Sequence, residues 1–417
     1  MITRKKIFGF ILLTILATGC YIWIDNNPLP SPLLEQVRPI PNSPYISALG
    51  IHLYLDGEKY QFTGVNAFHL GTYPSVNAGC GSPVEDIDSF FSQFQPHTVV
   101  RIWAFQGGMA TNVKTKKLDW RGLDRVVNAA QSHGMKLVLT LGDQSGTCDD
   151  GHWKDLRWYQ LGYQRSVNDL GNGLTPLPYL DYVKAIVERY KDSTAIAMWE
   201  PINEPEASDC QNYRGGDCYN HQTCNEASAS AALRAFYDTV GQTIKQIDNN
   251  HLISSGLIGS GQCGASHENY SHLHQSKWID IASYHDYGED TNPFPGDQWN
   301  GLKKRLEQMK QINKPLFIGE AGIKAKDNSS DCMDYAARKE KIKMKMDAQF
   351  EAGVVGYLLW AFTGGTSPIC NYDIVDNDPL LSLLKSYPIS MGNFSPESTS
   401  SGIFYSFDPQ STASGSQ

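Results

Sequence analysis

The sequence is short of positive charge. Its 417 residues contain 35 Lys and Arg against 44 Asp and Glu, so the formal net charge at pH 7 is −9. Three of the positive charges stand at positions 4–6, and without residues 1–19 the net charge falls to −12. An acidic chain of this kind argues against nucleic acid or another polyanion as its ligand. Charged residues make up only 19% of the chain and hydrophobic residues 41%, which excludes a disordered or fibrous chain and predicts a large buried core.

The N-terminus has the pattern of an export signal. Its three basic residues precede an uncharged run, Ile7–Gly19, as the n-region precedes the h-region of a secretory signal. The run ends in Leu16–Cys20, which resembles a bacterial lipobox with Cys20 as the lipid attachment site, although Ala stands where such boxes usually carry Leu. Two alternatives stay open: an uncleaved membrane anchor, because Ile7–Ile24 is just long enough to span a bilayer, and ordinary cleavage. All three cases place the body of the protein in an oxidising, extracytoplasmic space. Lipid on Cys20 or an uncleaved anchor would also tether it to the membrane.

Beyond this signal, which comprises residues 1–20, neither end of the chain is expected to join the packed body. Six prolines in residues 21–45 disfavour a helix or a central strand and predict an extended tether. Residues 389–417 hold nine serines and neither Lys nor Arg, which predicts a disordered tail. Residues 46–388 therefore remain for one globular body.

Within this body, short apolar runs of strand length alternate with segments of helical period. The eight runs are Tyr60–Asn66, His97–Ala104, Met135–Gly142, Ala195–Trp199, Leu252–Leu257, Ile279–Tyr284, Pro315–Gly319 and Val354–Phe362. The helical segments between them include Leu123–His133, Tyr179–Tyr190, Ala229–Ile247, Leu302–Ile312 and Asp334–Gly353.

These repeated units predict a single (β/α)8 barrel of the TIM type. The runs are rich in Val, Ile and Leu on both faces, as parallel strands covered by helices should be. A hairpin with an Asp56-Gly57 turn precedes the barrel. The competing fold is a doubly wound open sheet, but no Gly-rich phosphate-binding fingerprint follows the first strand.

Two glutamates stand where a barrel places its catalytic groups, directly after strands. Glu204 follows the fourth run in the segment Trp199–Glu206, and Glu320 follows the seventh in Phe317–Gly322. Retaining glycosidases use two carboxyl groups about 5 Å apart, one as acid/base and one as nucleophile. We therefore predict that these two glutamates face each other across the barrel mouth. Solvated loop carboxylates or ion-pair partners are the alternative.

These segments resemble glycoside hydrolase family 5, in the clan of retaining barrel enzymes, and the resemblance covers essentially the whole body. It rests on the fourth and seventh strands and on matches to four others: Phe62–Ala67 to the first strand, Val99–Phe105 to the second, Ser283–Tyr287 to the sixth and Leu359-Trp360 to the eighth. The resemblance implies that Glu204 is the acid/base and Glu320 the nucleophile. It implies no cofactor and no metal.

The resemblance also implies a set of substrate-binding residues. These are Arg101, Trp103, Asn203, His285, Tyr287 and Trp360. A positive charge on Arg101 would keep Glu320 ionised. His285 and Tyr287 are two apart on one strand and therefore share a face, and Trp360 would stack on the apolar face of a pyranose. The alternatives are a surface ion pair for the arginine, core hydrogen bonds for the His-Tyr pair and ordinary burial for the tryptophan.

The third strand departs from the family pattern. Many members carry a histidine at its end, whereas this chain reads Leu139–Gln144 without one. The mannanase-like branch also lacks this histidine, and the pair Arg101-x-Trp103 is similar to that branch. We therefore predict an endo-β-1,4-mannanase acting, as a monomer, on a neutral β-linked polysaccharide. A β-1,4-glucanase or another β-glycosidase of the clan is the alternative, and a non-catalytic carbohydrate-binding envelope protein is a further one.

Nine cysteines are an odd number for disulfide pairing. If Cys20 carries a lipid, eight remain, and all follow predicted strands in loops on the catalytic face. These are Cys80, Cys148, Cys210, Cys218, Cys224, Cys263, Cys332 and Cys370. We expect four disulfides that pin the loops shaping a substrate cleft, with the pairing open among 105 possibilities. A zinc site at Cys218-x2-His221-x2-Cys224 is an alternative.

Overall fold

The computed structural model describes residues 43–165, 173–210, 222–288, 292–326, 332–367, 369–387 and 390–392. The predicted signal with Cys20, nearly all of the tether and most of the tail lie outside these residues. Within them, no helix combines the length and the hydropathy that crossing a bilayer requires.

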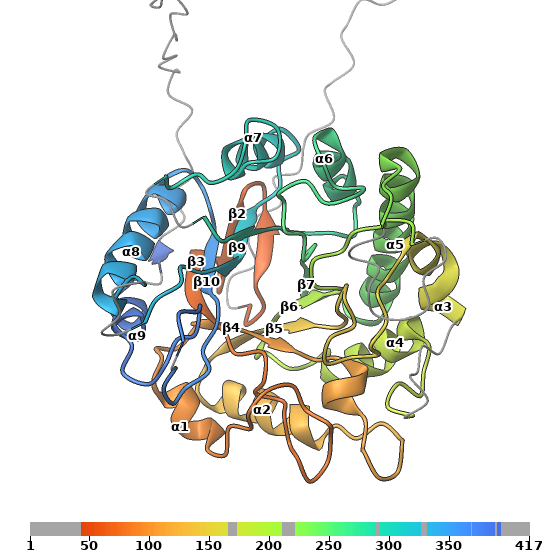
Figure 1. The fold of residues 1–417 in the computed structure, drawn as a ribbon, viewed down its shortest axis with the longest axis horizontal. Helices are drawn as coiled ribbons and strands as arrows, with labels where there is room; N and C mark the ends of the chain where they lie inside the picture. The colour runs from red at the N-terminus through yellow and green to blue at the C-terminus, as the bar shows by residue number, and fades with distance from the viewer. Residues whose placement is uncertain are drawn as a thin grey trace, which may run out of the picture. The chain divides into compact units, whose positions relative to one another are not determined.

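Parallel strands form the barrel at the centre of the molecule (Figure 1). Their order is β7-β6-β5-β4-β3-β10-β9-β8, and a parallel bridge between Ser254 and Ile281 joins the two outer strands and closes the ring. The barrel strands are β3 (Glu58–Asn66), β4 (Val99–Trp103), β5 (Lys136–Thr140), β6 (Ile196–Glu200), β7 (Leu252–Ile253), β8 (Ala282–Asp286), β9 (Leu316–Ala321) and β10 (Gly356–Leu359). The predicted (β/α)8 barrel is confirmed.

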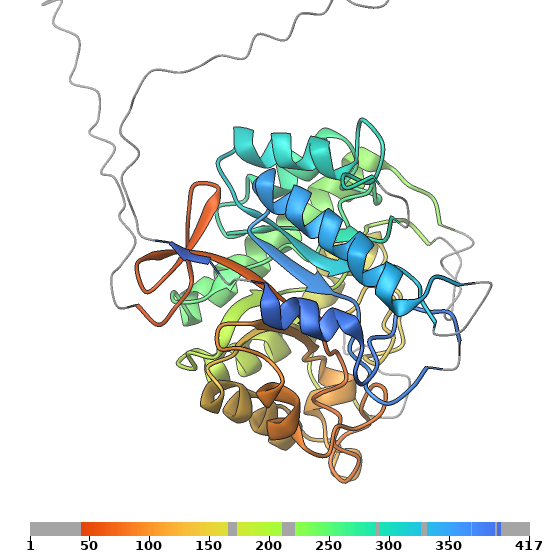
Figure 2. The ribbon, with the colours of Figure 1, turned by 90° about the vertical axis from the view of Figure 1, so that its left-hand side faces the viewer.

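Helices follow the barrel strands along the chain and surround them (Figures 1 and 2). They are α1 (Ile87–Ser92), α2 (Arg121–Ser132), α3 (Tyr163–Arg165), α4 (Tyr179–Tyr190), α5 (Glu226–Ile247), α6 (Glu268–His274), α7 (Leu302–Gln311), α8 (Tyr335–Glu351) and α9 (Pro379–Ser386). Two short π-helical turns, η1 (Gln106–Ala110) and η2 (Trp158–Gly162), lie in the loops after β4 and β5. The five predicted helices correspond to α2, α4, α5, α7 and α8.

An antiparallel extension covers the start of the barrel. Strands β2 (His52–Leu55) and β11 (Ser390–Gly392) pair with the first half of β3, and β1 (Ser47–Leu49) pairs with β2, as Figure 2 shows for β11 and the hairpin. Asp56 and Gly57 both have positive φ, at 55° and 82°, as a type I′ hairpin turn requires. The predicted hairpin is confirmed, and β11 carries the ordered chain beyond residue 388, where the body was expected to end.

The barrel interior changes from apolar to polar along the strands. A buried cluster that includes Phe62, Val99, Val138, Phe317 and Leu358 packs near the strand starts. Further along the same strands, the buried residues are Asn66, Arg101, Thr140, Glu200 and Glu320. Apolar packing near the strand starts makes this part of the barrel rigid, and the polar groups at the strand ends are therefore fixed in position.

Strand β7 is Leu252–Ile253 and is therefore shorter than the predicted run Leu252–Leu257. Gly256, inside that run, has a φ of +65°. A Cβ at this glycine would lie 2.1 Å from the carbonyl oxygen of Ile202. The Gly256 carbonyl accepts the backbone N–H of Glu204 at 2.8 Å. The chain therefore leaves the strand geometry early because it approaches the segment that carries Glu204.

Candidate active site

Arg101 is the centre of a buried polar network at the ends of the strands. Its Nη1 donates to Glu320 Oε1 at 2.7 Å, and its Nε and Nη2 donate to Glu200 Oε1 at 2.8 and 2.6 Å. Nη1 also donates to Asn66 Oδ1, and Nη2 to Asn203 Oδ1. Burial alone would lower the arginine pKa, but the charges of Glu200 and Glu320 raise it above its ordinary value. The planar guanidinium can therefore hold these groups at fixed angles.

Glu200 is the last residue of β6 and is completely buried. Besides Arg101, it accepts hydrogen bonds from Thr140 Oγ1 at 3.0 Å and from Ser254 Oγ at 2.9 Å. Its carboxylate is thus surrounded by protein donors. The half-buried Glu206 lies in the loop beyond, where burial raises its pKa.

Glu320, on β9, is 3% exposed. One of its oxygens accepts from Arg101, and the other accepts from the Tyr287 hydroxyl at 2.5 Å. Burial and the charge of Glu320 raise the pKa of Tyr287 well above its usual range, so the phenol stays protonated and donates. These two donors fix the orientation of the Glu320 carboxyl group.

Glu204 has a different environment. Its side chain is 31% exposed and its φ is +51°, and its backbone carbonyl accepts from Gln262 Nε2 at 2.7 Å. Glu204 Oε1 lies 2.7 Å from His285 Nδ1, and the same nitrogen lies 3.6 Å from Glu320 Oε2. Oxygens of the two carboxylates lie within 4.8 Å of each other.

His285 stands between these carboxylates on β8 and is buried. Burial alone would lower its pKa, but the charge of Glu320 and the hydrogen bond with Glu204 outweigh that effect and raise it above the usual value. The structure therefore brings together the predicted Arg101, Asn203, Glu204, His285, Tyr287 and Glu320.

Helix α8 fixes the end of β8 from outside the barrel. Asp286 Oδ1 accepts from Lys345 Nζ at 2.7 Å, and Asp286 Oδ2 accepts from Gln349 Nε2 at 2.8 Å. Lys345 also donates to the Gly288 carbonyl at 2.6 Å. All three side chains are buried. This clamp, formed by Asp286, Lys345 and Gln349, holds the residue between His285 and Tyr287.

Aromatic rings border the same strand ends. Trp360 stacks on Phe68 with ring centroids 5.4 Å apart, and it lies 5.6 Å from Trp103. Trp103 is 6% exposed, stacks on Phe105 and lies beneath the guanidinium of Arg101. Trp360 is half-buried and keeps an accessible part, whereas the buried Trp103 mainly supports its neighbours.

Several residues of the network were not assigned a role from the sequence. Asn66 ends β3 and donates to the carbonyls of Gly319 and Leu359, and Asp143, after β5, accepts from Asn203 Nδ2 at 3.0 Å. Thr140 and Ser254 hold Glu200. The available signal was position, because each polar residue lies at or just beyond the end of a barrel strand.

Three disulfides are described among the loops at this end of the barrel: Cys80–Cys148, Cys224–Cys263 and Cys332–Cys370. Cys210 is disulfide-bonded as well, and Cys218 lies outside the described residues, as does His221. The alternative zinc site is wrong, because the Cys224 sulfur is bonded to Cys263.

Paired glutamates at the ends of the fourth and seventh barrel strands, β6 and β9, place this protein in the class of glycoside hydrolases. The family model described as cellulase (glycosyl hydrolase family 5) matches residues 54–364, so the chain belongs to this family.

Named relatives agree with this membership. A protein described as probable mannan endo-1,4-beta-mannosidase A of Aspergillus flavus is 24% identical over 382 residues, covering 82% of this chain and 85% of the relative. Mannan endo-1,4-beta-mannosidase F of Aspergillus clavatus is 26% identical over 331 residues, covering 69% and 66%. The fold is similar to the endo-1,4-beta-mannanase of Rhizomucor miehei, with a TM-score of 0.56 at 19% identity over 82% of this chain and 97% of that one.

Proposed function

We propose that this glycoside hydrolase is a retaining endo-β-1,4-mannanase, with Glu320 as nucleophile and Glu204 as acid/base. The observation that carries the proposal is the close approach of two carboxylates in unlike surroundings, with oxygens within 4.8 Å of each other. Retaining enzymes need the carboxyl groups about 5–5.5 Å apart, whereas inverting enzymes leave room for a water between them.

The surroundings of Glu320 suit a nucleophile. Arg101 and Tyr287 donate to its two oxygens and so hold the carboxylate in one orientation before attack. In the first step, a Glu320 oxygen bonds to the anomeric carbon while the bond from that carbon to the leaving oxygen breaks. The Tyr287 hydrogen bond keeps the carboxylate oriented while its negative charge is neutralised by bond formation to the electron-poor anomeric carbon, which gives a neutral glycosyl ester.

The surroundings of Glu204 suit a group that exchanges protons. It is more exposed than Glu320, and its carboxylate pairs with His285, which can accommodate either protonation state. Glu204 protonates the leaving oxygen in the first step. In the second step it takes a proton from the water that attacks the anomeric carbon and releases the sugar from Glu320.

Mannan as the substrate rests on the relatives described as mannan endo-1,4-beta-mannosidases, and on Trp360 as a stacking surface for a pyranose. A β-1,4-glucanase is the second candidate, because the matching family model is described as cellulase. A non-catalytic carbohydrate-binding role is disfavoured, since both carboxylates and the arginine that supports them are in place.

The extracytoplasmic location is supported by the disulfides, which persist in oxidising compartments. We propose further that the chain acts as a monomer tethered to the membrane through lipid on Cys20 or through an uncleaved anchor. Fatty-acid labelling that Cys20→Ala abolishes supports the lipid. Release of unlabelled, soluble protein from the wild-type gene contradicts any tether.

Hydrolysis of a polysaccharide panel tests the proposed reaction. Mannan, β-1,4-glucan, xylan and galactan are incubated with the soluble body, and product lengths and the anomeric configuration are recorded. We expect internal cleavage of mannan with retained configuration. Glu204→Gln and Glu320→Gln should each lower kcat by about 100-fold or more while leaving folding intact.

Glu206→Gln is the matched control, because this half-buried glutamate lies two residues from Glu204 in the same loop. It should retain near wild-type activity. Full activity in either the Glu204 or the Glu320 variant contradicts the catalytic assignment. If the wild type cleaves β-1,4-glucan in preference to mannan, the proposed substrate is wrong and glucan takes its place.

A further inference from the structure

The side-chain amide of Asn203 has two partners of opposite character. Its Oδ1 accepts from Arg101 Nη2 at 2.6 Å, and its Nδ2 donates to Asp143 Oδ1 at 3.0 Å. A flipped amide would place NH2 against the guanidinium and oxygen against the carboxylate, and both contacts would then be repulsive. The orientation of Asn203 is therefore determined from two sides.

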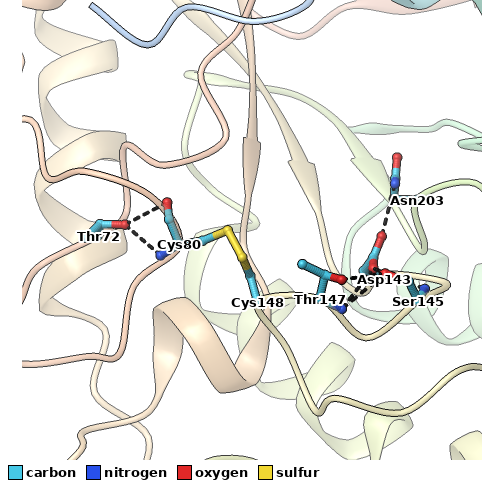
Figure 3. The surroundings of a disulfide bond; sticks show 7 residues. All are labelled: Thr72, Cys80, Asp143, Ser145, Thr147, Cys148 and Asn203. Carbon is cyan, nitrogen blue, oxygen red and sulfur yellow. Dashed lines mark hydrogen bonds between the residues drawn. A yellow bond between two sulfur atoms is a disulfide. The ribbon is translucent and has the colours of Figure 1, made fainter. Parts of the chain in front are cut away.

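Asp143 is itself fixed by the loop that follows β5. Its Oδ2 accepts from the Ser145 N–H at 3.0 Å, from the Ser145 hydroxyl and from the Thr147 N–H at 3.1 Å. Its side chain is 7% exposed. Because these donors occupy Oδ2, Oδ1 is left for Asn203, as Figure 3 shows.

The backbone makes the same connection. Asp143 and Asn203 form a parallel bridge outside the named strands. The Asn203 N–H donates to the Gly142 carbonyl at 2.8 Å, and the Gln144 N–H donates to the Asn203 carbonyl at 3.2 Å. A shift of the loop after β5 would consequently move the residue that precedes Glu204.

A disulfide anchors the far end of this loop. Cys148, directly after Thr147, is bonded to Cys80, 68 residues earlier in the chain. The Cys80 N–H donates to Thr72 Oγ1 at 2.9 Å, and the Thr72 hydroxyl donates to the Cys80 carbonyl at 3.2 Å. Figure 3 shows these residues in one row that runs from Thr72 through the disulfide to Asp143 and Asn203.

We propose that Asp143 is a positioning residue that acts through Asn203, and that the Cys80–Cys148 disulfide holds it in place. The inference rests on the proposed function. The fixed amide keeps one N–H of Asn203 available as a donor toward a sugar hydroxyl beside the reacting carbon, and the Asp143 charge strengthens that donor. The same contacts set the path of the chain into Glu204.

Asp143→Asn is the direct test, because it keeps the size of the side chain and removes one of the two charges that determine the amide orientation. We expect kcat/KM on the hydrolysed glycan to fall roughly tenfold to 100-fold, since misplacement by about 1 Å can cost about 10²-fold. On an Asn203→Ala background the same substitution should have no further effect. If Asp143 had a purely structural role, the two substitutions would act independently, and their losses in kcat/KM would multiply in the double variant.

Asp119→Asn is the matched control. Asp119 also accepts from an asparagine, Asn112 Nδ2 at 2.9 Å, in a loop after a neighbouring strand, and it has no contact with Asn203. It should leave kcat/KM near the wild-type value. Wild-type kcat/KM in Asp143→Asn, or full multiplication with Asn203→Ala, overturns the inference.

The disulfide is tested by Cys80→Ser with Cys148→Ser against the control pair Cys332→Ser with Cys370→Ser. We expect the first pair to lower kcat/KM, with no added loss on the Asp143→Asn background. The control pair should lower kcat/KM less than the first pair, and its effect should multiply with that of Asp143→Asn. The Cys80–Cys148 disulfide has no positioning role if both pairs lower kcat/KM equally. The same conclusion follows if the losses of the first pair and of Asp143→Asn multiply fully when the substitutions are combined.

A crystal structure of Asp143→Asn separates this inference from the proposed function. If the wild type hydrolyses no glycan, the proposed function fails. The position of the Asn203 amide in the crystal structure then tests the inference on its own. A flipped or displaced amide supports the positioning role of Asp143, and an unmoved amide overturns it.

Discussion

The imidazole of His285 lies between two carboxylates, and its protonation links the stability of the fold to pH. Glu320 and Glu204 raise its pKa above the ordinary value of 6.5. A raised pKa gives a stabilisation that is complete below pH 6.5, the pKa in the unfolded chain, and is lost as pH rises through the pKa of the folded state. His285→Gln should remove this dependence, so the difference in Tm between wild type and variant shrinks with rising pH.

His69 is the control with the opposite sign. Burial lowers its pKa to about 4, so its contribution to stability falls as pH drops from about 6.5 to 4. His69→Gln should therefore flatten the acid side of the profile of Tm against pH. A His285→Gln profile parallel to that of the wild type between pH 6 and 8 contradicts the expected link.

At the residue scale, the sequence was informative where a chemical role needs a particular side chain. Both glutamates could be chosen because they follow strands that meet at one end of a barrel. Arg101, His285 and Tyr287 could be chosen because their segments resemble glycoside hydrolase family 5. Asp143 could not be chosen. Its role depends on which amide hydrogen faces it across two loops, and this is a feature of three-dimensional geometry rather than of spacing.

The contact between β8 and α8 is the element-scale feature that positions two site residues. In the clamp, Lys345 pairs with Asp286 in a buried environment, so Lys345→Met leaves an unpaired carboxylate. We expect a loss of about 3–5 kcal/mol in the free energy of unfolding. Asp286→Asn combined with Lys345→Met should recover much of it, because neither partner is then charged. Denaturant unfolding measures both effects.

Arg338 and Asp378 supply the matched pair, since Arg338 lies on the same helix and both side chains are buried. Arg338→Met should lower stability by a similar amount but change kcat/KM less than Lys345→Met, because Arg338 donates to Asp378 and to the Asp373 carbonyl rather than to a residue of β8. Equal changes in kcat/KM would argue against the clamp as a positioning device.

Element types were predictable where periodicity was strong, as for α4 and α5. Strand β7 was overestimated, because the predicted strand extended to Leu257, whereas Gly256 at positive φ turns the chain away from strand geometry. Helix α9 and the π-helical turns were missed. Their lengths of eight and five residues are too short for a clear helical period.

On the scale of the whole molecule, disulfides connect loops that are far apart in the chain. The sequence separations are 68, 39 and 38 residues for the bonds at Cys80, Cys224 and Cys332. Restricting the unfolded chain over such spans contributes about 2–5 kcal/mol for each bond. Cys224→Ser with Cys263→Ser should therefore lower the denaturant midpoint. An unchanged midpoint would show that this bond contributes little to folding.

The closed barrel and the loop location of the cysteines could be predicted, because strand number and strand order along the chain are visible as apolar runs. The pairing of the cysteines could not, since many pairings satisfy the same spacings. The antiparallel strand β11 was assigned to a polar tail. Its three residues have little apolar character, and their order comes from backbone pairing with β3.

The first and last described residues lie beside the start of β3. The Ser43 carbonyl accepts from the Asp56 N–H, and Met391 pairs with Tyr60, near the start of β3. The last residue of β3, Asn66, contacts Arg101 in the catalytic network. At about 3.3 Å per residue, the six residues from Tyr60 to Asn66 separate this pairing from the reaction centre by roughly 20 Å. A fused binding module or a solid support joined directly at residue 43 or residue 392 would therefore leave access for long polymers unobstructed.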